Sequence, residues 1–197
     1  MHPVSVREPA HKSTSLRPEL VLLGLLVLQE CHGYELYRRF SETLAGLWHI
    51  SESQMYATLK RLEEKNLLAA SNAGEGLAVS RRILSPTSTG KALFESWLAG
   101  PSPCRPRTLR LEFLTRLYFA RQLVPDSMPG LIEKQRSSVL ESLQIMQPSQ
   151  GKPCQQDPAA QGFDISRLAD DFTTTQLRSA LEWIDASIIP ALQGETR

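Results

Sequence analysis

The segment Ser51–Glu64, SESQMYATLKRLEE, constrains the fold most, because it carries both the start signal and the periodicity of one amphipathic helix. Ser51 and Gln54 have the spacing of a capping box: the serine side chain accepts from the backbone N–H of Gln54, and the glutamine side chain reaches back to the N–H of Ser51. Apolar residues then recur at the i, i+4, i+7 spacing of one helix face: Met55, Leu59 and Leu62. The sequence therefore predicts a helix that begins after Ser51 and buries one face.

The opposite face of this predicted helix is polar and carries Ser53, Gln54, Thr58, Lys60 and Arg61, with Tyr56 at the boundary. Short hydroxyl and amide groups near the start, followed by basic side chains, favour a helix that meets base edges and phosphates in the major groove of DNA. The alternative is an ordinary surface helix, because the segment also contains acids that would repel phosphate: Glu52, Glu63 and Glu64. A Gln54 side chain that caps the helix cannot also read a base, so these two roles are alternatives.

The residues before this helix predict the first part of a helix-turn-helix. Leu20–Leu28 is an apolar run expected in a helix from Pro18 to about Cys31. A second helix is expected over about residues 34–44, and a glycine-containing turn at 46–49 joins it to the capped helix. Two helices joined by such a short turn are typical of a helix-turn-helix.

The residues after the capped helix predict a β-wing. Two short apolar runs flank a glycine-containing tip at residues 72–76, as in a β-hairpin. Arg81 and Arg82 lie on the returning strand, and at least one of them points to solvent because neighbours alternate faces. That strand should end before Pro86, since proline cannot donate to the ladder, and Thr87 is expected to cap the next helix.

The proline-rich segment at residues 100–106 predicts a domain boundary. The expected division is a disordered tail at 1–16, a winged helix-turn-helix DNA-binding domain at 17–100, and an α-helical dimerisation domain at 107–193 with a flexible loop at 147–163. The expected fold class is therefore mainly α.

The last predicted helix carries an apolar stripe that we expect at a dimer interface: Leu168, Phe172, Leu177, Leu181, Ile184 and Ile188. Three apolar-striped helices without a sheet need a partner surface. A second copy of the chain is the economical partner, because a two-fold dimer buries the same stripe twice. The sequence thus predicts a homodimer.

The composition argues against several other classes. Lys and Arg number 22 against 21 Asp and Glu, a formal net charge of +1, so nucleic-acid binding must rest on local basic clusters. The three cysteines are far apart, which argues against a disulfide framework and a zinc site. The Leu20–Leu28 run is far shorter than the ~20 residues that cross a bilayer, so we expect a cytoplasmic protein without membrane contact. Motifs such as HExxH or a phosphate loop are lacking, so no enzyme, metal or cofactor is expected.

Three sets of residues resemble the PadR family of transcriptional regulators. They are LLGLL at Leu22–Leu26, HGYEL at His32–Leu36, and Trp48 with Ser51 and MYATLKRLE at Met55–Glu63. The helices beyond Leu109 resemble the longer PadR subtype, which is AphA-like and has a C-terminal helical domain. The resemblance covers about residues 20–192 and is strongest before Leu98.

The resemblance implies a sequence-specific DNA-binding transcriptional regulator, usually a repressor, that binds a pseudo-palindromic operator in double-stranded DNA as a homodimer. The residues expected at the DNA are Tyr34, Ser51, Ser53, Gln54, Tyr56, Thr58, Lys60, Arg61, Lys65, Arg81 and Arg82. Some members of the family respond to phenolic acids and drugs, so a small-molecule effector is a further expected partner. Aromatic side chains that could line its pocket, or else belong to the core, are Tyr118, Phe119, Phe172 and Trp183.

Two other function classes stay open. A winged helix can serve as a protein-interaction module, or as a ligand-sensing adaptor, without binding specific DNA. The near-neutral net charge is compatible with both. A DNA affinity that falls steeply with salt would exclude both, because that dependence reports the release of counterions from neutralised phosphates.

Overall fold

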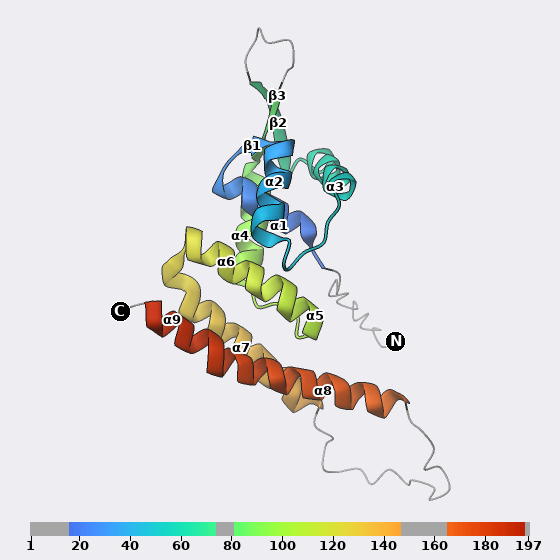
Figure 1. The fold of residues 1–197 in the computed structure, drawn as a ribbon, viewed down its shortest axis with the longest axis vertical. Coiled ribbons are helices and arrows are strands. Elements are labelled where there is room, and N and C mark those ends of the chain that lie inside the picture. Colours follow the sequence, from blue (N-terminus) through green and yellow to red (C-terminus); the bar gives the residue numbers. More distant parts are fainter. Residues whose placement is uncertain (1–15, 74–80, 147–164, 196–197) are drawn as a thin grey trace, which may run out of the picture.

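Three layers follow one another along the long axis of the molecule (Figure 1). The computed structural model describes residues 16–73, 81–146 and 165–195. The first layer consists, in chain order, of α1 (Pro18–Leu28), β1 (Cys31–His32), α2 (Gly33–Leu44), α3 (Glu52–Glu64), β2 (Leu68–Ala73), β3 (Arg81–Pro86) and α4 (Ser88–Ala99). A mainly α fold with a winged helix-turn-helix, as expected from the sequence, is confirmed.

The second and third layers are helical. The second consists of α5 (Pro106–Thr108), the π-helix η1 (Leu109–Phe113) and α6 (Leu114–Leu123), and the 3-10 helix η2 (Pro125–Ser127) leads out of it. The third consists of α7 (Met128–Met146), α8 (Ile165–Trp183), the π-helix η4 (Ile184–Ile188) and α9 (Ile189–Glu195). The loop predicted at 147–163 and the tail predicted at 1–16 lie outside the described residues, apart from Leu16.

The sheet has three antiparallel strands in the order β1-β3-β2, one more than the sequence predicts. The additional strand, β1, pairs Cys31 with Leu84 and His32 with Ile83. The first helix accordingly ends at Leu28 rather than near Cys31. A strand of two residues shows no periodicity, which is why the sequence did not reveal it.

The wing strand β3 extends to Pro86, so the prediction that it ends before this proline is wrong. Pro86 lies opposite Leu68 in the ladder, and the next N–H, that of Thr87, donates to the carbonyl of Leu67 at 3.1 Å. Bonded and non-bonded pairs alternate between antiparallel strands, so Pro86 occupies a pair where no donor is needed. Thr87 then caps α4 as predicted, accepting from the N–H of Gly90 at 3.0 Å. The predicted hairpin tip includes residues 74–76, which lie outside the described residues.

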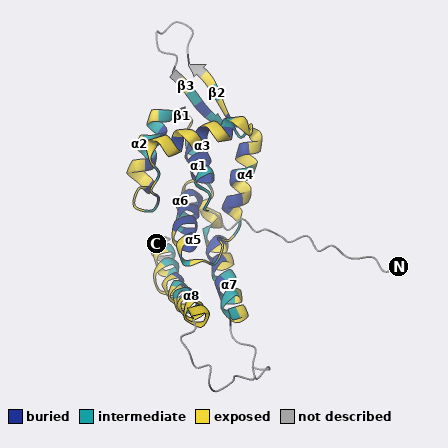
Figure 2. Ribbon diagram, turned by 90° about the vertical axis from the view of Figure 1, so that its right-hand side faces the viewer, coloured by how far each residue is buried: buried dark blue, intermediate teal, exposed yellow. Residues whose placement is uncertain are grey.

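One hydrophobic core joins the first two layers around α1, which is dark blue in Figure 2. A Cβ added at Gly24 would lie 2.5 Å from the rings of both Phe94 and Phe119, so only glycine allows this approach of α4 and α6 to α1. The Phe94 and Phe119 rings meet edge to face, with centroids 5.2 Å apart. Residues on both sides of the proline-rich segment therefore share a core, and the division into domains stays a prediction.

The apolar stripe of the last predicted helix is partly used within the chain. Leu177 packs with Leu109 and Val139, and Ile184 packs with Phe113 and Ile132, so both are buried. Two further stripe residues, Leu181 and Ile188, are half-buried in the same clusters. The remaining two, Leu168 and Phe172, are exposed, with 63% of Phe172 accessible. Leu177 and Ile184, which were predicted at a dimer interface, are therefore buried within the chain itself, and the dimer stays a prediction.

Candidate nucleic-acid interface

The start of α3 is fixed by the predicted capping box. The N–H of Gln54 donates to Ser51 Oγ at 3.2 Å, and the N–H of Ser51 donates to Gln54 Oε1 at 3.0 Å. Because Gln54 Oε1 is engaged, this side chain caps the helix in the absence of DNA. Its amide nitrogen is the remaining polar group that can face a ligand.

The outer face of α3 is polar and open to solvent. The predicted contact residues exposed along it are Ser51, Ser53, Gln54, Tyr56, Lys60 and Arg61. Tyr56 was predicted at the boundary of this face. Its side chain is 43% exposed, and its ring lies against Gly33, where an added Cβ would come within 2.8 Å of Cε1. Gly33 begins α2, whose next residue, Tyr34, is also exposed. Tyr34 thus directly follows the residue against which the Tyr56 ring packs.

Thr58 does not lie on this outer face, contrary to the prediction. It is only 5% exposed, its hydroxyl donates to the carbonyl of Gln54 at 2.8 Å, and it accepts from Arg61 Nη2 at 2.9 Å. The sequence contained the signal, because Thr58 stands at i+3 from Met55, on the apolar side of the helix. Its hydroxyl is committed inside the protein.

The wing brings one arginine next to α3. Arg82 Nη2 lies 3.3 Å from Glu63 Oε2, and the carbonyl of Arg82 is 3.1 Å from His32 Nδ1. The neighbouring Arg81 lies opposite Ala73 in the ladder, and its side chain is outside the described residues. Lys65 follows α3 directly and is exposed.

A cleft of about 1220 Å³ separates α3, from Gln54 to Arg61, from α5, η1 and α8. Among the described residues, its lining includes five cationic side chains and no acidic one: Lys60, Arg61, Arg105, Arg107 and Arg110. Apolar walls come from both sides, with Trp48 and Ile50 before α3, Leu111 in η1 and Phe172 in α8. The cleft is thus amphipathic and positively charged.

The aromatic residues considered for an effector pocket do not come together. Only Phe172 lines the cleft. Phe119 packs edge to face on Phe94 in the core and also contacts Tyr118, and Trp183 packs on Phe113 at 6.5 Å between ring centroids. Residues that do line the cleft, such as Arg107 and Arg110, lie on the first turns after the proline-rich segment, which the sequence indicated only as a domain boundary.

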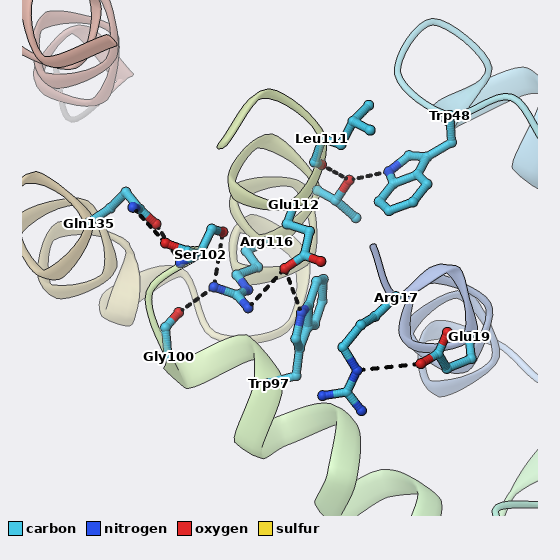
Figure 3. A network of polar contacts seen from close by, with 11 residues as sticks. Arg17, Glu19, Trp48, Trp97, Gly100, Ser102, Leu111, Glu112, Arg116 and Gln135 are labelled. Carbon is cyan, nitrogen blue, oxygen red and sulfur yellow. Dashed lines mark hydrogen bonds and ion pairs between the residues drawn. The ribbon is translucent and has the colours of Figure 1, made fainter. Parts of the chain in front are cut away.

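A buried polar network holds the far wall of the cleft against α4 (Figure 3). Arg116 Nη1 donates to the carbonyl of Gly100 at 2.8 Å and to Ser102 Oγ at 3.0 Å, and Nη2 lies 3.4 Å from Glu112 Oε2. The same carboxylate oxygen accepts from Trp97 Nε1 at 3.4 Å, and the Arg116 guanidinium lies 4.6 Å from the Trp97 ring centroid. Burial lowers the pKa of Arg116 to about 10, so it stays charged at neutral pH.

The third helical layer contributes to the same junction. Gln135 on α7 accepts from the N–H of Ser102 at 2.6 Å and donates to the carbonyl of Ser102 at 3.1 Å. The proline-rich segment is therefore hydrogen-bonded to α6 and to α7. These bonds hold α5 and η1 across the cleft from α3.

Within the ranges 16–73, 81–146 and 165–195, His, Cys, Asp and Glu side chains form no group that could hold a metal ion. Over the same ranges, the helices are too short or too polar to span a membrane.

Comparison with known proteins identifies the family. The sequence model of the transcriptional regulator PadR-like family matches residues 22–96. The negative transcriptional regulator PadR of Bacillus subtilis is 30% identical over 127 residues, which cover 62% of this chain and 69% of that protein. A probable transcriptional regulator of Mycobacterium tuberculosis is 31% identical over 90 residues, 45% of this chain and 47% of its own length. The crystal structure of Bacillus subtilis PadR in complex with operator DNA is 24% identical, covers 90% of this chain and 99% of its own, and has a TM-score of 0.43. The chain belongs to the PadR-like family of transcriptional regulators.

Proposed function

We propose that this regulator is a sequence-specific DNA-binding repressor that acts as a homodimer on a pseudo-palindromic operator. The observation that carries the proposal is the exposed polar face of α3, with Tyr56 at its boundary and Arg82 of the wing near its end. Helix and wing together offer a major-groove element and a backbone-contacting element. The relative in Bacillus subtilis is named a negative regulator, which supports repression.

The proposed contacts divide by chemistry. Ser53 and the free amide nitrogen of Gln54 lie near the N-terminus of α3, where short polar side chains reach base edges. The other contacts proposed on the helix-turn-helix, which go to phosphates or nearby base edges, are Tyr34, Ser51, Tyr56, Lys60, Arg61 and Lys65. Arg81 and Arg82 contact the backbone or minor groove from the wing. Thr58 is left out because its hydroxyl is buried and bonded internally.

The proposed dimer uses the part of the stripe that the chain itself leaves exposed. Leu168 and Phe172 on α8 are the exposed members, and the half-buried Leu181 and Ile188 continue the same helix face. A two-fold axis through this region would present two copies of α3 to successive major grooves, about 34 Å apart. The division into a DNA-binding part at 17–100 and a dimerisation part at 107–193, and the cytoplasmic location, belong to this proposal.

As a second function, we propose that the cleft binds a small organic anion, which acts as an effector. Five cations without an acid in the described lining favour a negative charge, and Trp48, Leu111 and Phe172 offer apolar surface to its body. Gln54 and Arg61 line the cleft and also belong to the DNA-contacting face, so an occupant would compete with DNA for them. Benzoate is a suitable probe, and its binding should weaken in Arg110→Ala.

Fluorescence anisotropy with fragments of the regulator's own upstream DNA and scrambled DNA, at two salt concentrations, tests the DNA-binding proposal. We expect preferential binding to one fragment and an affinity that falls steeply with salt. Lys60→Ala should reduce the slope of log K against log salt by about 1 per subunit. Lys91→Ala is the matched control, because Lys91 is an exposed lysine on α4 and belongs neither to α3 nor to the wing. Weak, equal and salt-insensitive binding would favour the protein-interaction alternative instead.

A further inference from the structure

The contact between Glu63 and Arg82 joins the last turn of α3 to the start of β3. Arg82 Nη2 lies 3.3 Å from one carboxylate oxygen of Glu63 and 3.5 Å from the other. The Arg82 side chain nevertheless stays 59% exposed. A charged group of the wing is thus held beside the helix while it faces solvent.

The direction of Arg82 follows from the strand. Arg82, Leu84 and Pro86 share one face of β3, because alternate residues of a strand point the same way. Leu84 and Pro86 are buried against the helices, so Arg82 is turned toward α3 as well. Its main chain is held independently, by the ladder with Asn72 and by the contact between His32 Nδ1 and its carbonyl. The backbone and the guanidinium group of Arg82 are therefore both held in place.

Only one of the three guanidinium nitrogens of Arg82 contacts the carboxylate of Glu63. An arginine side chain carries five N–H donors in a planar fork, so donors remain for a second acceptor. A DNA phosphate could therefore accept from Arg82 while the pair with Glu63 persists.

We propose that Glu63 is a positioning residue, which aims Arg82 at the DNA backbone next to α3 and thereby supports operator preference. This inference rests on the DNA-binding function proposed above. It gives different roles to the consecutive acids Glu63 and Glu64, because only the first would support DNA binding. Glu63 and Glu64 both lie at the C-terminal end of α3, where a negative charge opposes the helix dipole and repels phosphate. Within the described part of the chain, only Glu63 of these two pairs with a cation of the wing.

A double-mutant cycle tests the proposal on the full-length protein. The variants are Glu63→Ala, Glu64→Ala, Arg82→Ala and the combination of Glu63→Ala with Arg82→Ala. For each, anisotropy gives the affinity for DNA that the unchanged protein selects from a random pool and for scrambled DNA. Glu63→Ala and Glu64→Ala remove the same charge from adjacent exposed or half-exposed positions, so they form a matched pair.

The expected result is that Glu63→Ala lowers the ratio of selected-DNA to scrambled-DNA affinity roughly twofold to fivefold, the range of an exposed ion pair. Glu64→Ala should leave the ratio unchanged or raise both affinities alike. In the Arg82→Ala background, Glu63→Ala should cause no further fall.

Two results would overturn the proposal while leaving DNA binding intact: an unchanged ratio in Glu63→Ala, or the same fall whether or not Arg82 is present. If the unchanged protein selects no DNA, both the proposed function and this inference fail. Circular dichroism of each variant checks that α3 is still formed.

Discussion

The helix α3 and the junction at residues 100–116 form opposite walls of the same cleft, but they are held in place by different kinds of interaction. α3 is delimited by contacts three or four residues apart, such as the reciprocal bonds of Ser51 and Gln54. The junction depends on partners that come from three helices, with Trp97, Arg116 and Gln135 all converging on a proline-rich segment. Local signals therefore determine the surface that we propose faces DNA, and long-range polar contacts determine how the rest of the chain is held against it.

The largest expected effect comes from breaking the junction. Arg116→Met leaves the buried carboxylate of Glu112 without its counter-charge, so we expect a loss of about 3–5 kcal/mol in the free energy of unfolding. Urea unfolding followed by circular dichroism measures it. The double variant Glu112→Leu with Arg116→Met should recover most of the loss, because neither charge then remains buried. A loss below about 1 kcal/mol would place the pair among weak surface contacts and contradict the account of the junction.

A smaller effect is expected where the second layer packs on the first. Gly24→Ala would push a methyl group into the rings of Phe94 and Phe119, and overpacking of this kind costs about 1–3 kcal/mol. Gly130→Ala on α7 is the control, since an added Cβ there meets nothing within 4 Å. It should stabilise the protein by up to about 1 kcal/mol through helix propensity alone. Thermal or urea unfolding that shows both variants shifted in the same direction would contradict the close packing of α1 on α6.

The smallest of the three effects is expected at the start of α3, which is delimited by contacts between nearby residues. Ser51→Ala removes the side-chain half of the capping box and should cost about 1 kcal/mol of stability. Ser53→Ala, two residues later and exposed, keeps the cap and should change stability by less than about 0.5 kcal/mol. Equal losses in urea unfolding would mean that the cap does not set the start of α3.

Features set by contacts between nearby residues could be predicted from the sequence, whereas features set by long-range contacts could not. The capping box, the cap at Thr87 and the apolar face of α3 are patterns within a few residues, and all are confirmed. Thr58 was assigned to the wrong face although its i+3 position indicated burial. The strand β1 needed its partner β3 to be recognised, because Cys31 and His32 carry no pattern of their own.

The junction was beyond prediction for a physical reason. Glu112 and Arg116 are visibly four residues apart, yet whether such a pair lies on the surface or is buried depends on Trp97 and Ser102, which the fold brings to it. The buried positions of Leu177 and Ile184 likewise depend on α7, so the sequence stripe alone could not separate contacts within the chain from contacts with a second copy.

Selection of bound fragments from a random-sequence DNA pool tests whether the protein is a dimeric, sequence-specific DNA-binding regulator, because it assumes no operator. We predict that the recovered DNA shares a pseudo-palindrome whose half-sites have centres about 10–10.5 base pairs apart, or a multiple of this, as two copies of α3 require. The enrichment should disappear at high salt. Recovery of fragments without a common motif, or with an unrepeated half-site only, would contradict a dimeric regulator that reads DNA with α3.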